Sequence, residues 1–159
     1  MFNGCRTPHC ARCGPAHAKA HPWQAGPVMR DLGQLTDDEW LDAFVSQWHL
    51  LADLSFSDLV LWKPLSEEGD VFACTAQVRP VTGPTALEED IVGELIEFEP
   101  DHQVTVAFMT HAIAETSDNE IGAGIPVDVW AIPVLRHDHP IAVIERHTNQ
   151  MGMRATGAL

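Results

Sequence analysis

The chain has 159 residues and a mass of 17.5 kDa, which suits one domain with a hydrophobic core of its own. It carries 9 Lys and Arg against 23 Asp and Glu, a net charge of −14, so it is a poor candidate for binding nucleic acid or anionic lipid. Its 45% hydrophobic content is that of a globular protein, and no apolar run approaches the roughly 18–20 residues of a membrane-spanning helix. Composition therefore predicts a soluble, acidic, non-membrane domain and names no chemistry.

The charge is unevenly distributed along the chain. Residues 1–35 hold four basic residues and one acid, whereas residues 36–159 hold five basic residues and 22 acids. The first segment also contains three of the four cysteines and several prolines, and it lacks a periodic apolar pattern. We therefore expect residues 1–30 to be a tail, disordered or outside the native start, and residues 31–159 to form the folded domain.

Cys10 and Cys13 in this tail have the C-x₂-C spacing with which two thiolates can bind one zinc ion. No second pair of ligands follows at a fixed spacing, and no apolar residues are present for a small zinc-bound core. A disordered arm, or a true start at Met29, are the alternatives. The tail also lacks the apolar segment of a signal peptide, which predicts a cytoplasmic protein with reduced cysteines.

The folded domain begins with a capping box, Thr36-Asp-Asp-Glu39, followed by apolar residues at three- and four-residue spacings. This pattern predicts one helix from about residue 37 to residue 53. Its apolar stripe packs on the core or, as an alternative, against a second copy of the same helix; the stripe consists of Trp40, Leu41, Phe44, Val45, Trp48, Leu51 and Ala52.

Four short apolar segments predict strands at residues 57–63, 71–79, 127–136 and 141–147. In the second strand, strict alternation places Phe72, Cys74, Ala76 and Val78 on one face. Pro133 predicts an edge position or a bulge. The first two strands should pair as one hairpin and the last two as another. Between these hairpins we expect an acidic irregular stretch, a helix over about 101–113 with His111 inward, and a polar loop over 114–126. The fold class is α+β, with a mainly antiparallel central sheet flanked by helices.

Sequence motifs for catalysis are absent: the chain has no G-x-S-x-G, P-loop or H-E-x-x-H sequence. Cys74 is interpreted as a small buried hydrophobe, and a redox-sensing or nucleophilic thiol remains the alternative. His49 and His102 are interpreted as surface and helix-capping residues, with metal or haem ligation as the alternative.

Three segments resemble one known family. They are residues 48–62 (WHLLADLSFSDLVLW), residues 72–85 (FACTAQVRPVTGPT), and residues 131–149, which contain AIPVLR and IAVIERHTN. Their order and spacing are similar to those of the N-terminal GAF-like sensor domain of cytosolic actinobacterial two-component histidine kinases, in which a GAF domain precedes a PAS domain and a kinase core.

The resemblance implies a GAF-like sheet with a small-molecule pocket over one face, a homodimer, and signal transfer to downstream PAS and kinase domains and, indirectly, to a response regulator. The chain has no phosphoacceptor or ATP-binding motif, so we expect a non-catalytic sensory module of a longer kinase. The ligand contacts we expect are Trp62, Phe72, Cys74, Ala76 and Trp130; no cofactor or signal can be named. The alternatives are a dimerisation module without a ligand and a Cys-dependent small-molecule enzyme.

Overall fold

The computed structural model describes residues 32–121 and 125–151. The chain divides into two compact units, Met1–Gln34 and Leu35–Leu159. In the first, Leu32–Gln34 forms one turn of 3-10 helix, and everything below concerns the second. The predictions for residues 1–30, including the metal pair Cys10 and Cys13, lie outside the described residues.

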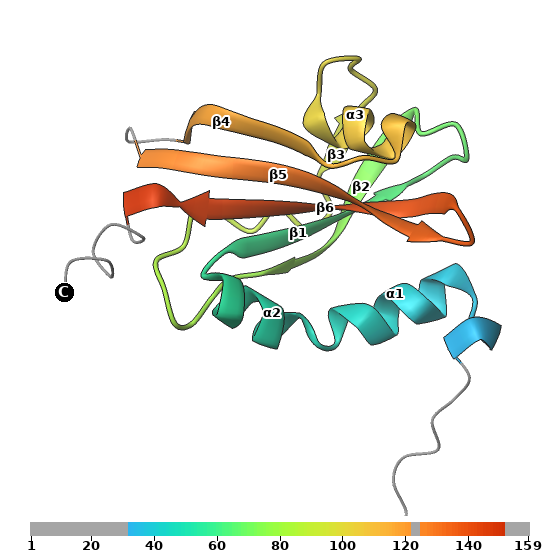
Figure 1. The fold of residues 1–159 in the computed structure, drawn as a ribbon, viewed down its shortest axis with the longest axis horizontal. Coiled ribbons are helices and arrows are strands. Elements are labelled where there is room, and N and C mark those ends of the chain that lie inside the picture. Colours follow the sequence, from blue (N-terminus) through green and yellow to red (C-terminus); the bar gives the residue numbers. More distant parts are fainter. Residues whose placement is uncertain (1–31, 122–124, 152–159) are drawn as a thin grey trace, which may run out of the picture. The chain divides into compact units, whose positions relative to one another are not determined.

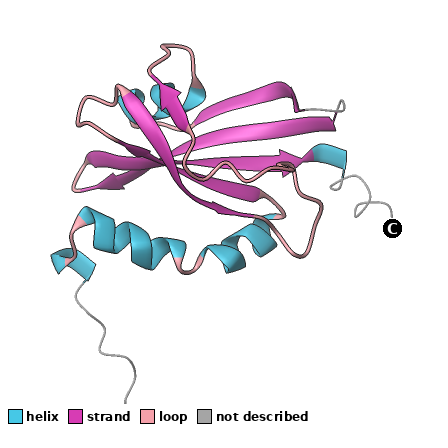
Figure 2. Cartoon of the chain, turned by 180° about the vertical axis from the view of Figure 1, so that it is seen from behind, coloured by secondary structure: helices cyan, strands magenta, loops and turns pink. Residues whose placement is uncertain are grey.

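The second unit is built on one six-stranded, entirely antiparallel sheet with the strand order β3-β2-β1-β6-β5-β4. Helices α1 and α2 lie along one face of the sheet and α3 lies on the other (Figures 1 and 2). The four predicted strands do share one sheet, as expected. The strands are β1 (Asp58–Pro64), β2 (Val71–Val78), β3 (Leu95–Glu97), β4 (Ala114–Ile121), β5 (Ile125–Arg136) and β6 (His139–Asn149).

The predicted capping box is confirmed. The Thr36 backbone N–H donates to the Glu39 carboxylate at 2.9 Å, and the Glu39 N–H donates to the Thr36 hydroxyl at 3.3 Å. The single helix predicted to follow it is wrong, because the chain forms α1 (Asp37–Val45) and α2 (Trp48–Ser55). At the break, the Ser46 hydroxyl bonds the Ala43 carbonyl at 2.6 Å, and such a local bond offers the backbone an alternative to the helix.

The two helices nevertheless present one apolar surface to the sheet. Phe44 stacks on Trp40 with ring centroids 5.2 Å apart and meets Trp48 edge-on at 5.9 Å. Trp48 is 1% exposed and packs with Leu61 of β1, so the stripe serves the core. The buried members of this core are Leu41, Trp48, Ala52, Leu59, Leu61, Val78, Val134 and Ala142.

A bulge in β2 overturns the predicted face assignment. Leu61 pairs with Ala76 but the next β1 residue, Trp62, pairs with Cys74, which leaves Thr75 as an extra residue. One extra residue reverses the side on which all later side chains point. Phe72 and Cys74 therefore join the core on the α3 face, whereas Ala76 and Val78 join the core under α1 and α2. The expectation that all four share a face is wrong.

Two strands were not predicted. β3 has only three residues, and β4 occupies most of the expected polar loop. Both are the outer strands of the sheet. β3 is too short to show a period, and the polar and acidic residues of β4 protect an open edge and obscure the apolar alternation that marks a half-buried strand. The β4–β5 pairing ends at Ala114 and Ala131, so Pro133 faces a side of β5 with no neighbouring strand, as its missing N–H requires.

Helix α3 (Gln103–Thr110) lies inside the predicted range of 101–113. His102 is its N-cap, with Nδ1 accepting from the Val104 N–H at 3.2 Å, so the capping role expected for this histidine is confirmed. His111 is not inward as expected. It is exposed and ends the helix in the left-handed conformation with φ of 57°.

Gly69 in the β1–β2 turn generates a stability prediction. Its φ is +72°, and a Cβ there would lie 2.8 Å from Cε1 of Phe108. Gly93 also has a positive φ, +97°, but nothing lies within 4 Å of its Cβ position. Both Gly→Ala variants therefore lose about 1–2 kcal/mol of unfolding free energy to backbone strain, and Gly69→Ala loses about 1–3 kcal/mol more because it overpacks the core. Urea unfolding of the two variants measures the difference, and equal losses would contradict the close contact with Phe108.

Candidate functional site

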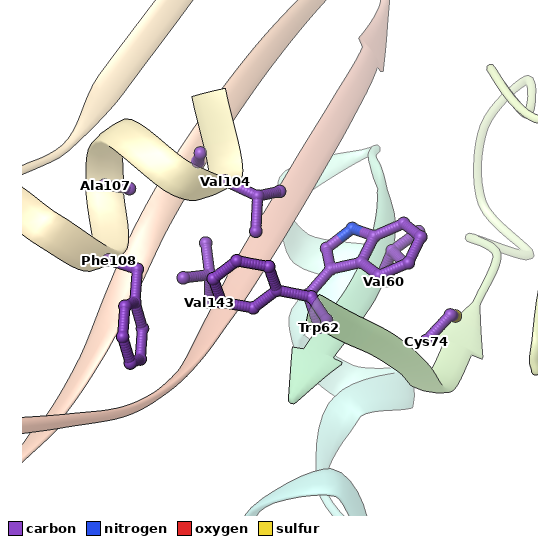
Figure 3. Close-up of a cluster of buried hydrophobic side chains, with 9 residues drawn as sticks. Val60, Trp62, Cys74, Val104, Ala107, Phe108 and Val143 are labelled. Atoms are coloured by element: carbon purple, nitrogen blue, oxygen red, sulfur yellow. The ribbon is translucent and has the colours of Figure 1, made fainter. Parts of the chain in front are cut away.

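The α3 face of the sheet is filled by side chains over β1 and β2. Trp62, Phe72 and Cys74 are each 3% exposed or less, and Phe72 packs edge-on against Phe108 of α3 at 5.2 Å. Figure 3 shows Val104, Ala107 and Phe108 of α3 facing Val60, Trp62 and Val143 of the sheet. Trp62, Phe72 and Cys74, three of the five expected ligand residues, are thus core residues in this structure.

The other two candidates lie on the opposite face. Ala76 is beyond the β2 bulge and packs under α1 and α2. Trp130 pairs with Arg146 across β5 and β6, on the face opposite to its neighbours Val129 and Ala131. The five candidates therefore do not converge on one surface, and ligand binding by them stays a prediction.

Cys74 has the environment of a structural cysteine. Its thiol donates to the Ala76 carbonyl at 3.7 Å, and burial, supplemented by the charges of Asp90 and Glu94, raises its pKa to about 11. A thiol that is protonated at neutral pH is a poor nucleophile. The geometry therefore does not support the Cys-dependent enzyme that the sequence left open.

The same sheet face becomes polar toward the start of β1 and the end of β6. Four polar side chains point to this face, and each is 7% exposed or less: Asp58 of β1 and, at every second position of β6, Glu145, His147 and Asn149. We call these four residues the polar belt. A run of four buried polar side chains is uncommon, because each must find a hydrogen-bond partner or remain costly to bury.

Two members of the belt hold a neighbouring loop. The Asp58 carboxylate accepts from the Thr85 hydroxyl at 2.7 Å, from the Leu87 N–H at 3.3 Å and from the Ala86 N–H. The Asn149 side chain donates to the Thr85 carbonyl at 3.0 Å. These bonds attach residues 85–87 to the sheet, which explains why both side chains are buried.

Glu145 is an ionised carboxylate inside the protein. Its Oε2 accepts from the Trp62 indole N–H at 2.7 Å and lies 3.4 Å from Nε2 of His147. Burial alone would raise the Glu145 pKa, but His147, the Trp62 N–H and the charge of His102 together outweigh it and lower the pKa.

His147 is the unsatisfied member of the belt. Its Nδ1 has no hydrogen-bond partner among the described residues, and its Nε2 has only the 3.4 Å ion-pair contact with Glu145, although the residue is only 7% exposed. On α3, Thr105 Oγ1 and Gln103 Oε1 are likewise buried without a partner in the described part of the chain. A buried polar atom left unpaired costs about 1–3 kcal/mol, so such atoms mark places where water or a polar ligand binds.

Sequence reasoning missed the belt, although one signal for it was present. Glu145, His147 and Asn149 occupy every second position of a strand whose preceding alternate residue, Val143, is apolar. An apolar-to-polar change along one face of a buried strand indicates a polar site in the interior, but the expected ligand residues lie only on β1, β2 and β5.

The surface also has a groove of about 690 Å³ at the end of the sheet, where β1 and β6 separate after the pair Trp62 and Val143. Ion pairs of Lys63 with Asp38 and of Arg136 with Asp37 border it, and none of the expected ligand residues lines it. Among residues 32–121 and 125–151, no three His, Cys, Asp or Glu side chains are placed to bind a metal ion. No helix within the described ranges is long and apolar enough to cross a membrane.

The Glu145 environment predicts a pH effect on folding. Because its pKa is lower in the folded protein than the ordinary value of 4.5, the ionised carboxylate stabilises the fold above that value, and this stabilisation is lost as the pH falls through the folded pKa. The unfolding free energy of the wild type should therefore fall toward that of Glu145→Gln on acidification from about pH 6 to pH 3. Urea unfolding across this range tests it, with Glu115→Gln on β4 as the exposed control. A pH-independent difference between wild type and Glu145→Gln would contradict it.

Comparison with known proteins identifies relatives of this chain. A family model described as "Histidine kinase PdtaS, GAF domain" matches residues 31–159. The sensor histidine kinase PdtaS of Mycolicibacterium smegmatis is 37% identical over 123 residues, which cover 75% of this chain and 24% of that protein. The PdtaS protein of Mycobacterium tuberculosis is 33% identical over 121 residues, covering 72% of this chain and 23% of the relative.

A solved structure, described as the sensor region of a sensor histidine kinase, superimposes with a TM-score of 0.53 at 32% identity. The match covers 74% of this chain and 38% of that one. The chain spans about a quarter of the length of the curated relatives it matches.

Proposed function

This chain belongs to the family of GAF domains of the histidine kinase PdtaS, and we propose that it is the sensory input domain of a cytoplasmic two-component histidine kinase. The observation that carries the proposal is the family match over residues 31–159, together with relatives named as sensor histidine kinases. The expected boundary between a tail of residues 1–30 and a sensor domain of residues 31–159 is part of this proposal.

In this proposal the domain regulates a kinase core that lies elsewhere in the parent protein. PAS and kinase domains follow it, and a response regulator receives the phosphate. The chain itself has no phosphoacceptor or ATP-binding motif, so its contribution is a change of conformation. A ligand that prefers one of two conformations by about 1–3 kcal/mol changes the output about 5–150-fold.

We place the signal-binding site at the polar belt. His147 supplies a buried Nδ1 without a partner among the described residues, and Glu145, 3.4 Å from its Nε2, supplies an ionised carboxylate. A small polar molecule that hydrogen-bonds these atoms would relieve the cost of burying them. It would therefore favour the conformation in which the polar belt is buried. A signal of this kind fits the site better than the apolar ligand implied by Trp62, Phe72 and Cys74, which are already packed.

Native mass spectrometry of the chain purified from its native host tests this site. The wild type should carry a small molecule that survives gentle desolvation, and His147→Phe should lower its occupancy at least about tenfold because a polar ring partner is lost. His139→Phe is the matched control, since His139 is an exposed histidine of the same strand outside the belt. If the wild type carries nothing, the ligand-free dimerisation module is the better description; equal occupancy in His147→Phe would place the ligand elsewhere.

We also propose that the domain forms a homodimer through the outer surface of α2. Leu50 and Leu54, one helical turn apart, are 61% and 70% exposed. Phe56 and Val81 extend the same apolar surface beside the end of α2, where Asp53 bonds the Val81 N–H at 2.7 Å. An apolar patch of this kind on a small domain is typical of an interface with another protein chain.

Leu54→Lys tests the dimer. It should raise the dimer dissociation constant at least about tenfold, because a charge is buried at the centre of an apolar contact. Sedimentation equilibrium measures the constant. Leu65→Lys is the matched control, since Leu65 is equally exposed at 62% but lies in the β1–β2 turn. A wild type that remains monomeric, or equal effects of the two variants, would contradict an interface at α2.

A further inference from the structure

Arg146 occupies an unusual position on the face of the sheet that carries α1 and α2. It lies on β6 between Leu59 of β1 and Trp130 of β5, its register partners on either side. Its guanidinium carbon lies 4.5 Å from the centre of the Trp130 ring, a cation–π contact that holds the planar group against the indole. The side chain is half-buried.

The other described cations of this unit are paired. Lys63 bonds Asp38, Arg79 bonds the carbonyls of Leu87 and Glu88, and Arg136 bonds Asp37 and the Leu35 carbonyl. Arg146 has no hydrogen bond or ion pair to any described residue, and its Nε is buried without an acceptor. This is notable in a domain where, from residue 36 on, 22 acids face five basic residues.

An unpaired guanidinium in so acidic a domain indicates that the fold keeps its own carboxylates away from Arg146. Leaving a buried N–H without an acceptor is costly, and Trp130 fixes the group in one orientation instead of allowing it to reach solvent freely. A planar fork of donors held in this way matches the two oxygens of a carboxylate.

Arg146 lies on the face of the sheet that α2 covers. The Ser57 and Thr148 hydroxyls, 2.8 Å apart, join the chain just after α2 to β6, and Thr148 lies two residues beyond Arg146. On the other side, Gln150 bonds Asp128, which lies two residues before Trp130 on β5. The Arg146–Trp130 pair is therefore on the same side of the sheet as α2, whose exposed leucines form the proposed dimer surface.

We propose that Arg146, held flat on Trp130, binds a carboxylate of a second copy of this chain. This inference rests on the proposed homodimer and deepens it, because it adds a charged contact to the apolar one made by α2. In a two-fold dimer the contact occurs twice. Charge complementarity favours a second copy as the occupant, since its surface is rich in acids, of which Asp42 on α1 is one that is exposed.

Sedimentation equilibrium of the full chain at low and high salt tests the proposal. Arg146→Gln should raise the dimer dissociation constant at least about tenfold and reduce its salt dependence, because a desolvated charge pair is lost from each half of the interface. Arg146→Lys should give an intermediate constant, since it keeps the charge but not the planar fork. Lys63→Gln removes one positive charge on the same side of the sheet, where Lys63 pairs with Asp38, and should leave the constant unchanged.

The outcomes separate this inference from the dimer itself. If Leu54→Lys abolishes the dimer while Arg146→Gln leaves its constant and salt dependence unchanged, the Arg146 contact is wrong and the α2 interface stands. If the wild type is monomeric, both fall. If Arg146→Gln lowers the melting temperature of the dilute monomer by more than about 4 °C, Arg146 serves the fold itself and the proposed intermolecular contact is overturned.

Discussion

The extra residue at Thr75 is the constraint on which the rest of this domain depends. Strand β2 must supply side chains to two separate cores, and strict alternation would send Phe72, Cys74, Ala76 and Val78 to the same one. The bulge divides them, so that Phe72 and Cys74 meet α3 while Ala76 and Val78 meet α1 and α2. Without it, the α3 layer would lose the buried ring of Phe72 and the other layer would be overfilled.

The division also leaves the two parts of the α3 layer with different characters. Over β1 and β2 the α3 layer is closed by Trp62, Phe72 and Phe108, and dense packing leaves these side chains little room to admit a ligand. Over β6 the same layer holds Glu145, which is bonded to Trp62 and His147, and His147, whose buried Nδ1 has no partner among the described residues. Trp62 links the two regions, because its ring is part of the core and its N–H is bonded to Glu145.

The sequence predicted those parts of the fold in which local pattern and tertiary environment agree. The capping box at Thr36, the strands near β1, β2, β5 and β6, and the cap at His102 are of this kind. It failed where a single residue or a neighbouring strand decides the outcome. The break after Val45 and the bulge at Thr75 leave apolar spacing almost unchanged. β3 has only three residues, and β4 is an edge strand whose polarity resembles that of a loop. The polar belt was missed because none of the expected ligand residues lay on β6.

The two proposed sites are one residue apart on the same strand. Glu145 and His147 point to the α3 layer, and Arg146 between them points to the face shared with α2. β6 is hydrogen-bonded to β1 along Asp58–Trp62 and to β5 along most of its length, so a shift of its backbone at His147 would be shared with Arg146. In the proposed function, this strand is therefore the element that connects the interior site with the contact between subunits, and the physical requirement for coupling is a change in the backbone of β6 on ligand binding.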